Sequence, residues 1–563
     1  MVLIFLSWIY ITFTASNMGV WFAKCFRIKT SDFVVTIFLG FVPTLLFSGF
    51  WAVFGRLNWE FHVFLLLLNG LLFWKFRKDI RLLYSDFLLQ LKDLKKTQKV
   101  LLPIISLLII AQCATAPFLP DNESYYIQTV KWLNEFGLVN GLANLHFFFG
   151  QTSGWHVLQS VFSFSFAYSG FNDLSGYCLL LGNVFAFLRL NDYFKKGKFI
   201  DLAVGLFPLA NVLLFAFISA PSPDVAVYVL TFIIFYIAGN QGKQEITAHF
   251  SLLVIFVLLA LLIKVTALPL ILIPLVLLIH NYRILAPKLG WIAILSMAVL
   301  SLFLIKNAIL SGYIFYPIVE TGRLSFDYTV PQTIADSFGS ASRASAFYLT
   351  ESQYKGMNQW QVFMQWINLP KLDGLFNKIL VLLVLFSPIA IYLKFNEKKI
   401  WTLYFTMLAA SFLFYFTSPQ YRFFLNYILF FSFLMLAIFF YQKKTIFSLL
   451  ILSAAVTGIL LFFPVGMERF TNNKLLSASQ FQKEYLVFPH GNSKNPNGFE
   501  QQQKGNLKYF SPMNNDFFWG NGDGNLPCIN TPQLHYFEKY YGFRPQLRGG
   551  NLKNGFYSQN TAP

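Results

Sequence analysis

Long apolar segments alternate with short polar segments from the first residue to about residue 464. A transmembrane helix needs about 20 mostly apolar residues, because a rise of about 1.5 Å per residue must cross about 30 Å of hydrocarbon. This criterion predicts fourteen helices, several of them short, so we expect twelve to fourteen spans. They lie near residues 1–22, 33–54, 60–74, 100–118, 173–190, 199–218, 224–239, 248–263, 267–280, 289–307, 377–394, 400–416, 422–441 and 445–464. The first lacks the basic start of a secretory signal and is predicted to be a retained span.

The short polar segments differ in their content of Lys and Arg, which predicts the orientation of the chain. The basic ones are expected on the cytoplasmic side. They are residues 23–32, 75–99, 191–198, 240–247, 281–288, 394–399 and 442–444. Two long loops, 119–172 and 308–376, then face outward together with the tail after residue 465. This arrangement requires that Trp155–Gly170 does not cross the bilayer, and so short a segment is more typical of a helix that lies in the interface or dips into it.

The outward-facing parts carry weaker structural signals. In the first loop, Tyr126, Val130 and Leu133 recur at helical spacing opposite polar positions, which predicts an amphipathic helix at the membrane interface. The tail is rich in Asn, Gly and Gln and contains turn clusters such as NSKNPNG and WGNGDGNLP. We therefore expect a small extracytoplasmic appendage with little helix.

Composition supports a membrane protein and excludes several other classes. The 563 residues are 56% hydrophobic and 12% charged, too apolar for a soluble chain. The net charge of +18 arises largely from the short basic segments, so it indicates orientation and no nucleic-acid partner. Four scattered cysteines predict neither a zinc site nor a disulfide framework. The chain lacks a Walker A loop and the GxGxxG, HExxH and GxSxG motifs.

Two acids stand at the water side of a predicted span in the stretch FLPDNESYY. Two interpretations of Asp121 and Glu123, helix capping and catalysis, have equal weight. In the first, Pro-Asp-Asn-Glu is a common helix start, with Asp as the N-cap. In the other reading, an ionised acid beside the bilayer serves as a general base on a substrate whose lipid tail stays in the membrane. The Asp-x-Glu spacing also admits a divalent cation such as Mg²⁺ or Mn²⁺, but two carboxylates without further ligands are a weak metal signal.

A third acid and three cations lie near the outer ends of predicted spans. Asp224 follows Ser-Pro and is a good helix-start residue, yet its position on the side of Asp121 makes it a secondary candidate. Lys264, Lys306 and Arg422 are costly at that depth unless they reach the interface or meet an anion. One lysine would be expected to snorkel. Three cations together suggest a binding site for a lipid phosphate or pyrophosphate.

The segment GLANLHFFFGQTSGWH contains further candidates for substrate binding. His146 and Trp155, with Tyr126 just before this segment, are placed among aromatic rings and glycines. Such a set suits a sugar platform, but it is equally typical of an ordinary interfacial loop. A histidine among such rings is most often a packed side chain, and metal ligation is the less favoured reading.

These segments together resemble the GT-C superfamily of integral-membrane glycosyltransferases, and more closely an uncharacterised bacterial family of multi-spanning proteins that looks GT-C-like. The matching pieces extend from about residue 100 onward, and the first and last of them are the distinctive ones. They are DNESYYIQTVKWLNEFGLVNGLANLHFFFGQTSGWHVL, APSPDV, IKVTALPLILIP, KNAILSGYIFYPI, SPQYRFF, GDGNLPC and LRGGNLKNGF. Members of that family favour a histidine beside the tyrosine after the acid, where this chain has Tyr125 and Tyr126.

The resemblance implies an all-α polytopic membrane protein, a GT-C-like bundle with outer-face amphipathic helices. It implies three parts: N-terminal helices and a basic loop at 1–99, the core at 100–464, and the tail at 465–563. It also implies transfer of a sugar from a polyprenyl-phosphate donor to a glycan, lipid or protein acceptor outside the bacterial inner membrane, with Asp121, or alternatively Glu123, as the catalytic acid.

Two other functions stay open at this point. A polymerase or ligase of lipid-linked glycans would also need outward loops and clustered cations. A transporter or flippase of lipid-linked or anionic solutes would need ionisable groups near mid-membrane, whereas this chain has most of them at helix ends.

Overall fold

The computed structural model describes residues 1–563 except 29, 241–245, 396, 464, 473–479, 495–497, 514 and 562–563, and except the side chain of residue 338. The protein is 71% helical. Within the described residues, twelve helices are long and apolar enough to cross a membrane. The prediction of a helical multi-pass membrane protein is therefore confirmed.

All fourteen predicted segments are helical, although two are shorter than a typical span: Pro223–Gly239 and Val265–His280. The helices at the fourteen predicted segments are α1 (Val2–Cys25), α2 (Phe33–Phe54), α3 (Trp59–Lys92), α4 (Lys96–Cys113), α7 (Leu174–Lys196), α8 (Phe199–Gly205) with α9 (Asn211–Leu214), α10 (Pro223–Gly239), α11 (Ile246–Ile263), α12 (Leu272–His280), α13 (Tyr282–Leu285) with α14 (Leu289–Ser311), α18 (Lys371–Ala390), α19 (Lys398–Thr417), α20 (Tyr421–Phe439) and α21 (Lys443–Phe462).

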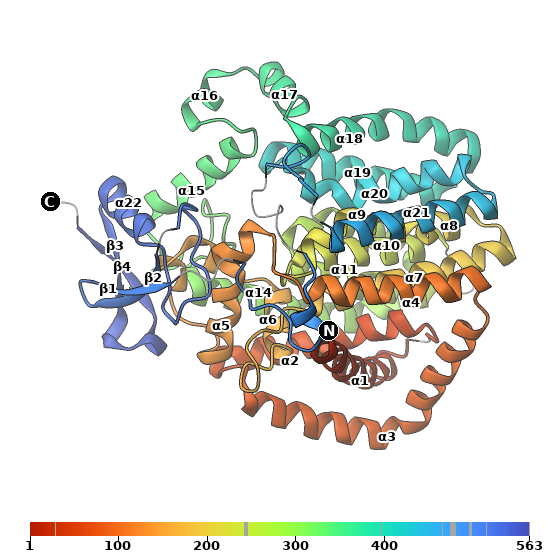
Figure 1. Cartoon of the computed structure of the whole chain (residues 1–563), viewed down its shortest axis with the longest axis horizontal. Coiled ribbons are helices and arrows are strands. Elements are labelled where there is room, and N and C mark those ends of the chain that lie inside the picture. The colour runs from red at the N-terminus through yellow and green to blue at the C-terminus, as the bar shows by residue number, and fades with distance from the viewer. Residues whose placement is uncertain are drawn as a thin grey trace.

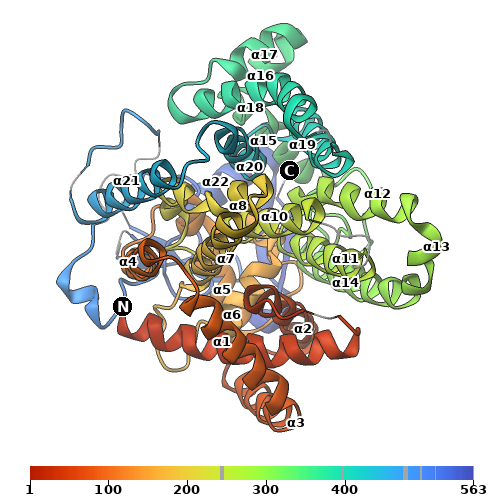
Figure 2. The ribbon, with the colours of Figure 1, turned by 90° about the vertical axis from the view of Figure 1, so that its right-hand side faces the viewer.

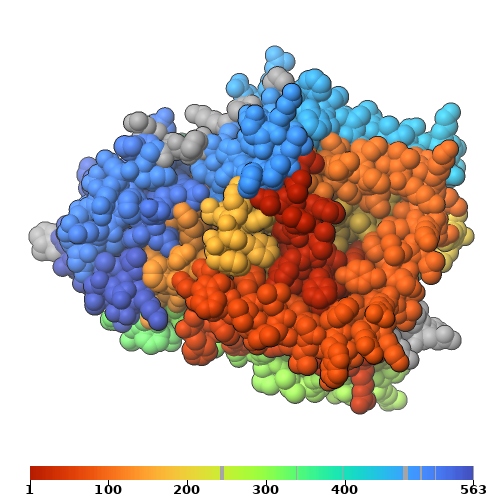
Figure 3. Space-filling view, turned by 60° about the horizontal axis from the view of Figure 1, so that its bottom comes forward, coloured from red at the N-terminus to blue at the C-terminus, as the bar shows by residue number. Residues whose placement is uncertain are grey.

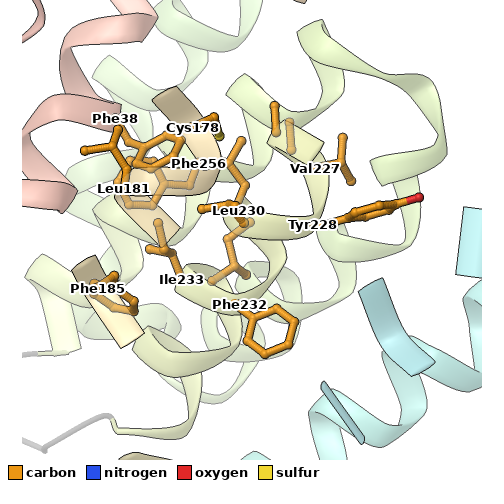
Figure 4. Close-up of a cluster of buried hydrophobic side chains, with 14 of the residues drawn as sticks. Phe38, Cys178, Leu181, Phe185, Val227, Tyr228, Leu230, Phe232, Ile233 and Phe256 are labelled. Carbon is orange, nitrogen blue, oxygen red and sulfur yellow. The ribbon is translucent and has the colours of Figure 1, made fainter. Parts of the chain in front are cut away.

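The helices form one bundle with α7 and α10 near its centre (Figure 2). Every residue of α10 is buried. Its side chains meet those of α2, α7 and α11 in an apolar cluster that includes Phe38, Leu181, Leu230 and Phe256 (Figure 4). A helix that is apolar on all sides can be covered by protein or face lipid, and neighbouring helices cover every face of α10.

The first two helices pack unusually closely. A β-carbon on Gly19 would lie 2.0 Å from the Thr36 carbonyl oxygen, and one on Gly40 would lie 1.9 Å from that of Ala15. Small residues let two backbones approach in this way, as is common between membrane helices. These glycines bring α1 and α2 together as a pair.

Described parts of four basic segments, 23–32, 75–99, 191–198 and 442–444, lie together at one end of the bundle, whereas residues 29 and 241–245, and residue 396 of the segment 394–399, lie outside the described residues. Lys24 pairs with Asp79 at 2.7 Å, and Arg189 pairs with Asp32 at 3.0 Å. Farther along the chain, the Tyr193 hydroxyl donates to the Tyr441 carbonyl at 3.0 Å. The basic segment at 75–99 continues α3 as a helix past a break at Phe76 (Figure 1).

The two long loops and the tail share the opposite end. The first loop contains the π turn η1 (Asn122–Tyr126), α5 (Ile127–Glu135) and α6 (Gly154–Val161). The second contains α15 (Gln332–Ser345), α16 (Glu351–Gly356) and α17 (Gln359–Ile367). Arg548 in the tail bonds to Asp327 in the second loop at 2.7 Å, and the Phe556 amide donates to the Asn140 carbonyl at 2.9 Å. The predicted grouping of these three parts is confirmed, while the side of the membrane that they face stays a prediction.

The tail forms a small domain with two antiparallel hairpins. Strand β1 (Phe499–Lys504) pairs with β2 (Leu507–Pro512), and β3 (Phe543–Leu547) pairs with β4 (Phe556–Asn560). One helix, α22 (Thr531–Tyr541), lies between the hairpins in the chain. Figure 3 shows the tail in blue, covering the end of the molecule beside the orange first loop.

Two expectations for the first loop need correction. The segment at 155–170 does not cross the bundle, as expected, but α6 is fully buried by α2, α5 and α11, so protein surrounds it on all sides. The polar face of the amphipathic helix α5 is covered in part, because Gln128 and Lys131 bond to the tail residues Gly522, Asp523 and Gly524, while Glu135 is exposed. Sequence periodicity cannot tell a polar face that meets lipid headgroups from one that meets protein.

Candidate functional site

Asp121 lies where the first loop meets the outer end of α20. It directly precedes the π turn η1, and its side chain makes no capping bond to that turn. Instead, Asp121 Oδ2 accepts a hydrogen bond from Arg422 Nη1 at 2.5 Å and a weak one from the Tyr126 hydroxyl at 3.4 Å. Asp121 thus stands at a helix start, as the pattern predicts, but its side chain does not cap the helix, and the carboxylate belongs to an ion pair between distant segments.

The ion pair determines the charge state of Asp121. Burial alone would raise the pKa of this carboxyl, but the positive charges of Arg422 and Lys264 outweigh it and hold the pKa below its usual value. The side chain is 26% exposed, so water or a substrate can still reach it. Asp121 is consequently an ionised, accessible carboxylate near neutral pH.

A second ion pair lies beside the first. Asp224, in the first turn of α10, pairs with Lys264, and the Asp224 side chain is 3% exposed. Lys264 reaches it because α11 ends at Ile263 and the backbone of Lys264 is extended. Asp224 therefore binds a cation instead of capping its helix, and Lys264 meets an anion instead of snorkelling.

Phe423 connects the two pairs. The Lys264 ammonium lies 4.5 Å from the centre of its ring, and the Arg422 guanidinium lies 5.3 Å from it. The faces of an aromatic ring attract cations, so Phe423 helps to hold two positive groups close together. This contact places Asp121, Asp224, Lys264 and Arg422 in one cluster, which we call the outer charge cluster.

Two further buried side chains border the outer charge cluster. The Tyr126 ring lies 4.7 Å from that of His156. Burial lowers the pKa of His156 to about 3, helped by the nearby charges of Lys306 and Lys264. His156 is thus neutral, and because its Nδ1 accepts the Ser153 amide at 3.2 Å, its proton is on Nε2. That N–H makes no hydrogen bond of normal geometry within the described residues.

Lys306, the third candidate cation, pairs with no carboxylate of the outer charge cluster. Its ammonium donates to the Thr152 carbonyl at 2.5 Å and lies 5.6 Å from the Phe303 ring centre. Among the described residues it forms no ion pair. With Lys306, the site contains three cations and two anions, a net charge of +1.

Arg422 also borders a cavity of about 160 Å³ at the foot of the second loop. Asp373 and Tyr348 line it too, and the Tyr348 hydroxyl donates to Asp373 at 3.0 Å. Sequence reasoning missed both residues. Asp373 stands in the first turn of α18, and a helix-start acid carries no signal that distinguishes it from a pocket residue.

Glu123 has a different environment from Asp121. Its carboxylate accepts hydrogen bonds from the Ser493 hydroxyl at 2.6 Å and the Lys494 amide at 2.9 Å, and its own carbonyl accepts the amides of Asn521 and Gly522. Burial raises the pKa of Glu123. These contacts anchor the tail to the first loop, so they favour a structural role over the alternative in which Glu123 replaces Asp121.

Two other candidate binding residues are packed in the interior. Trp155 is fully buried, and its Nε1 donates to the Ser175 hydroxyl at 3.0 Å. His146 is 4% exposed among the rings of Phe148, Phe149 and Trp519, and burial lowers its pKa to about 3. Neither side chain forms the exposed sugar platform that the sequence allowed.

The described residues offer no cluster of three or more His, Cys, Asp or Glu side chains around a common metal position. Asp121 and Glu123 have separate partners, so the Asp-x-Glu pair does not converge on one point. The residues present therefore do not fit the Mg²⁺ or Mn²⁺ site that this spacing suggested.

Comparison with protein-family models matches residues 1–429 to a family described as "Domain of unknown function (DUF8201)". The match passes through residue 100, where the sequence suggested a boundary, and it ends within α20. A comparison with curated proteins finds no match. Because the family model covers 429 of 563 residues, including both loops and most of the bundle, the chain belongs to the DUF8201 family.

Proposed function

We propose that this protein is a GT-C-like membrane glycosyltransferase that uses a polyprenyl-phosphate-linked sugar and acts at the end of the bundle that carries the two long loops. The observation that carries the proposal is the outer charge cluster. Its four charged residues come from the first loop and from the ends of α10, α11 and α20. Segments more than 300 positions apart contribute to one ion pair, which suits a site better than local helix capping.

The charge balance fits the phosphodiester of such a donor. A phosphodiester carries one negative charge, and the cluster with Lys306 has a net charge of +1. Within the described residues, Arg422 Nη2 has no hydrogen-bond partner, so the guanidinium retains a donor for a phosphate oxygen. Charge-assisted bonds of this kind are among the strongest in proteins.

In the proposed reaction, an acceptor hydroxyl attacks the anomeric carbon of the sugar while Asp121 takes its proton. The bond between the anomeric carbon and the phosphate oxygen breaks, and its electron pair leaves with the polyprenyl phosphate. Arg422, Lys264 and Lys306 stabilise the charge on this leaving group. Attack from the face opposite the phosphate inverts the anomeric configuration.

The Asp121–Arg422 pair suggests how donor binding prepares the base. A phosphate beside Arg422 would compete with Asp121 for the guanidinium. A carboxylate that loses a cation and gains a neighbouring anion becomes more basic. Binding of the donor would therefore convert a resting ion pair into a general base next to the reacting sugar.

The test compares wild type with Asp121→Asn in membranes that contain a polyprenyl-phosphate sugar, with mass spectrometry of the glycan products. The expected loss is at least about 100-fold, the usual contribution of a general base. Asp336→Asn, the same change at an exposed acid of the second loop, is the matched control and should retain activity.

Unchanged transfer by Asp121→Asn at normal expression would refute the proposal. Products lengthened by many sugars would instead identify a polymerase or ligase. Movement of an unmodified lipid-linked solute across proteoliposomes, without a covalent change, would identify a transporter.

A further inference from the structure

A cavity lies between the first loop and the tail, and none of the four residues of the outer charge cluster lines it. Its volume is about 370 Å³, within the range typical of ligand sites. One side is the face of α5 that carries Ile127, Val130 and Asn134, and the other side comes from tail residues such as Asn492 and Leu526. We call this cavity the loop–tail cleft.

The polar lining of the loop–tail cleft consists mainly of hydroxyl and amide side chains. These are Asn134, Ser163, Ser165, Ser169, Asn172, Asn492 and Asn525. Each of these groups can both donate and accept a hydrogen bond, as a sugar hydroxyl does. Ser165 Oγ has no hydrogen-bond partner in the described part of the chain.

The charges at the loop–tail cleft argue against an anionic ligand. Lys131 lines it, but its ammonium is engaged by the Asp523 carboxylate at 2.6 Å and by the carbonyls of Asp523 and Gly524. The other charged lining residue, Glu135, is exposed and would repel an anion. An uncharged ligand suits this balance best.

The apolar lining complements the C–H surfaces of a sugar ring. Phe136 and Phe171 contribute rings, and Val130, Leu526 and Leu552 contribute aliphatic surface. A pyranose presents hydroxyls around its edge and C–H groups on its faces, so it needs both kinds of contact. Asn134, Ser163, Asn172 and Asn492 already form hydrogen bonds within the protein. A purely lipidic ligand would leave the buried Ser165 hydroxyl without a partner, which is costly.

We propose that the loop–tail cleft binds a neutral oligosaccharide. The position of the cleft suggests that this oligosaccharide is the acceptor of the transferred sugar. Asn492 lines the cleft, and its carbonyl accepts a hydrogen bond from the side-chain amide of Asn122 at 2.8 Å. Asn122 is the neighbour of Asp121 in the chain. The acceptor role rests on the proposed function, whereas glycan binding does not.

The experiment applies the full chain in lipid nanodiscs to an array of neutral and acidic oligosaccharides. Wild type is expected to bind neutral members. Ser165→Trp and Asn525→Trp fill the cleft and should weaken binding at least about tenfold, equivalent to about 1.4 kcal/mol. Asn525 is exposed, so its variant should fold even if Ser165→Trp does not. Gln501→Trp, an exposed tail residue outside the cleft, is the matched control and should bind like wild type.

Three results would overturn the inference: no binding of neutral glycans by wild type, stronger binding of acidic glycans, or unchanged binding by a folded Asn525→Trp variant. Asp121→Asn separates the two proposals. If this variant binds glycans but transfers no sugar, both the glycosyltransferase proposal and the glycan-binding proposal are supported. If wild type transfers sugar but binds no glycan, only the glycan-binding proposal for the cleft is contradicted.

Discussion

At the residue scale, two acids two positions apart face different parts of the molecule. Successive residues of a helical turn are about 100° apart, so side chains at i and i+2 point in nearly opposite directions. Asp121 consequently meets α20, while Glu123 meets the tail. Of the two acids in this motif, Asp121 therefore belongs to the outer charge cluster and Glu123 anchors the tail to the first loop.

The ion pair with Arg422 predicts a shift in pH dependence. Because Arg422 lowers the pKa of Asp121, Arg422→Gln should raise that pKa. Activity that needs the carboxylate is lost as pH falls through this pKa, so the acidic limb of kcat/KM should move to higher pH in the variant. The residual transfer activity across pH measures the shift. An unmoved limb would mean that Asp121 is not the titrating base.

Glu123 predicts a change in tail docking. Glu123→Ala leaves the Ser493 hydroxyl and the Lys494 amide without their acceptor, at a cost of about 1–3 kcal/mol for each buried group. Hydrogen exchange should increase in residues 490–494 and in η1. Glu135→Ala, an exposed acid on α5, should leave exchange unchanged. Equal protection in both variants would contradict the anchoring role.

At the element scale, helix contacts depend on where small residues occur. Gly40 meets the α1 backbone, whereas a β-carbon on Gly70 of α3 would meet no atom within 4 Å. The same residue type therefore has a packing role in one helix and none in the other. Neither position could be distinguished by hydropathy.

This difference predicts opposite effects of alanine. Gly40→Ala forces α1 and α2 apart and should destabilise the protein by about 1–3 kcal/mol, as overpacking typically does. Gly70→Ala should be neutral or stabilise it by about 0.5–1 kcal/mol, because glycine weakens a helix interior. Thermal unfolding in detergent compares the two. Equal melting temperatures would show that the close approach of α1 and α2 contributes little.

The elements were largely predictable, and their partners were not. Hydropathy located all fourteen apolar segments because the requirement for length and apolarity acts within each segment. The position of α6 inside the protein and the cover over α5 depend on residues hundreds of positions away. Local sequence patterns therefore cannot predict such long-range contacts.

The site was predictable to a similar degree. The cost of charge in lipid pointed to Lys264 and Arg422, and a place on the side of Asp121 pointed to Asp224; all three do lie with Asp121. Trp155 and His146 were chosen for residue type, and their burial depends on tertiary packing. Asp373 was missed for the same reason, since its proximity to Arg422 arises from the packing of α18 on α20.

At the scale of the whole molecule, the amino terminus and the tail meet. The Met1 amino group donates to the Tyr485 carbonyl at 2.6 Å. Fourteen crossings would return the chain to the side where it began, in agreement with this contact. The Lys24 end of α1 lies with the other basic segments at the far end of the bundle.

Cysteine accessibility tests the proposed orientation. Of the four cysteines, all within the described residues, Cys25 at the basic end is exposed and the other three are buried. A membrane-impermeant maleimide should label wild type only in inside-out vesicles, and Gln501→Cys in the tail should react in intact cells. Labelling of Cys25 in intact cells would reverse the orientation.

The cover of the first loop by the tail has a consequence for biosynthesis. Glu123 and its partner Ser493 are 370 positions apart. At about 5–20 residues per second, the ribosome needs roughly 20–70 s to supply the missing half of this contact. Through that interval the first loop has to tolerate water on a surface that the tail later covers, and the hydrophilic side of α5 meets that demand while the rest of the chain is still being made.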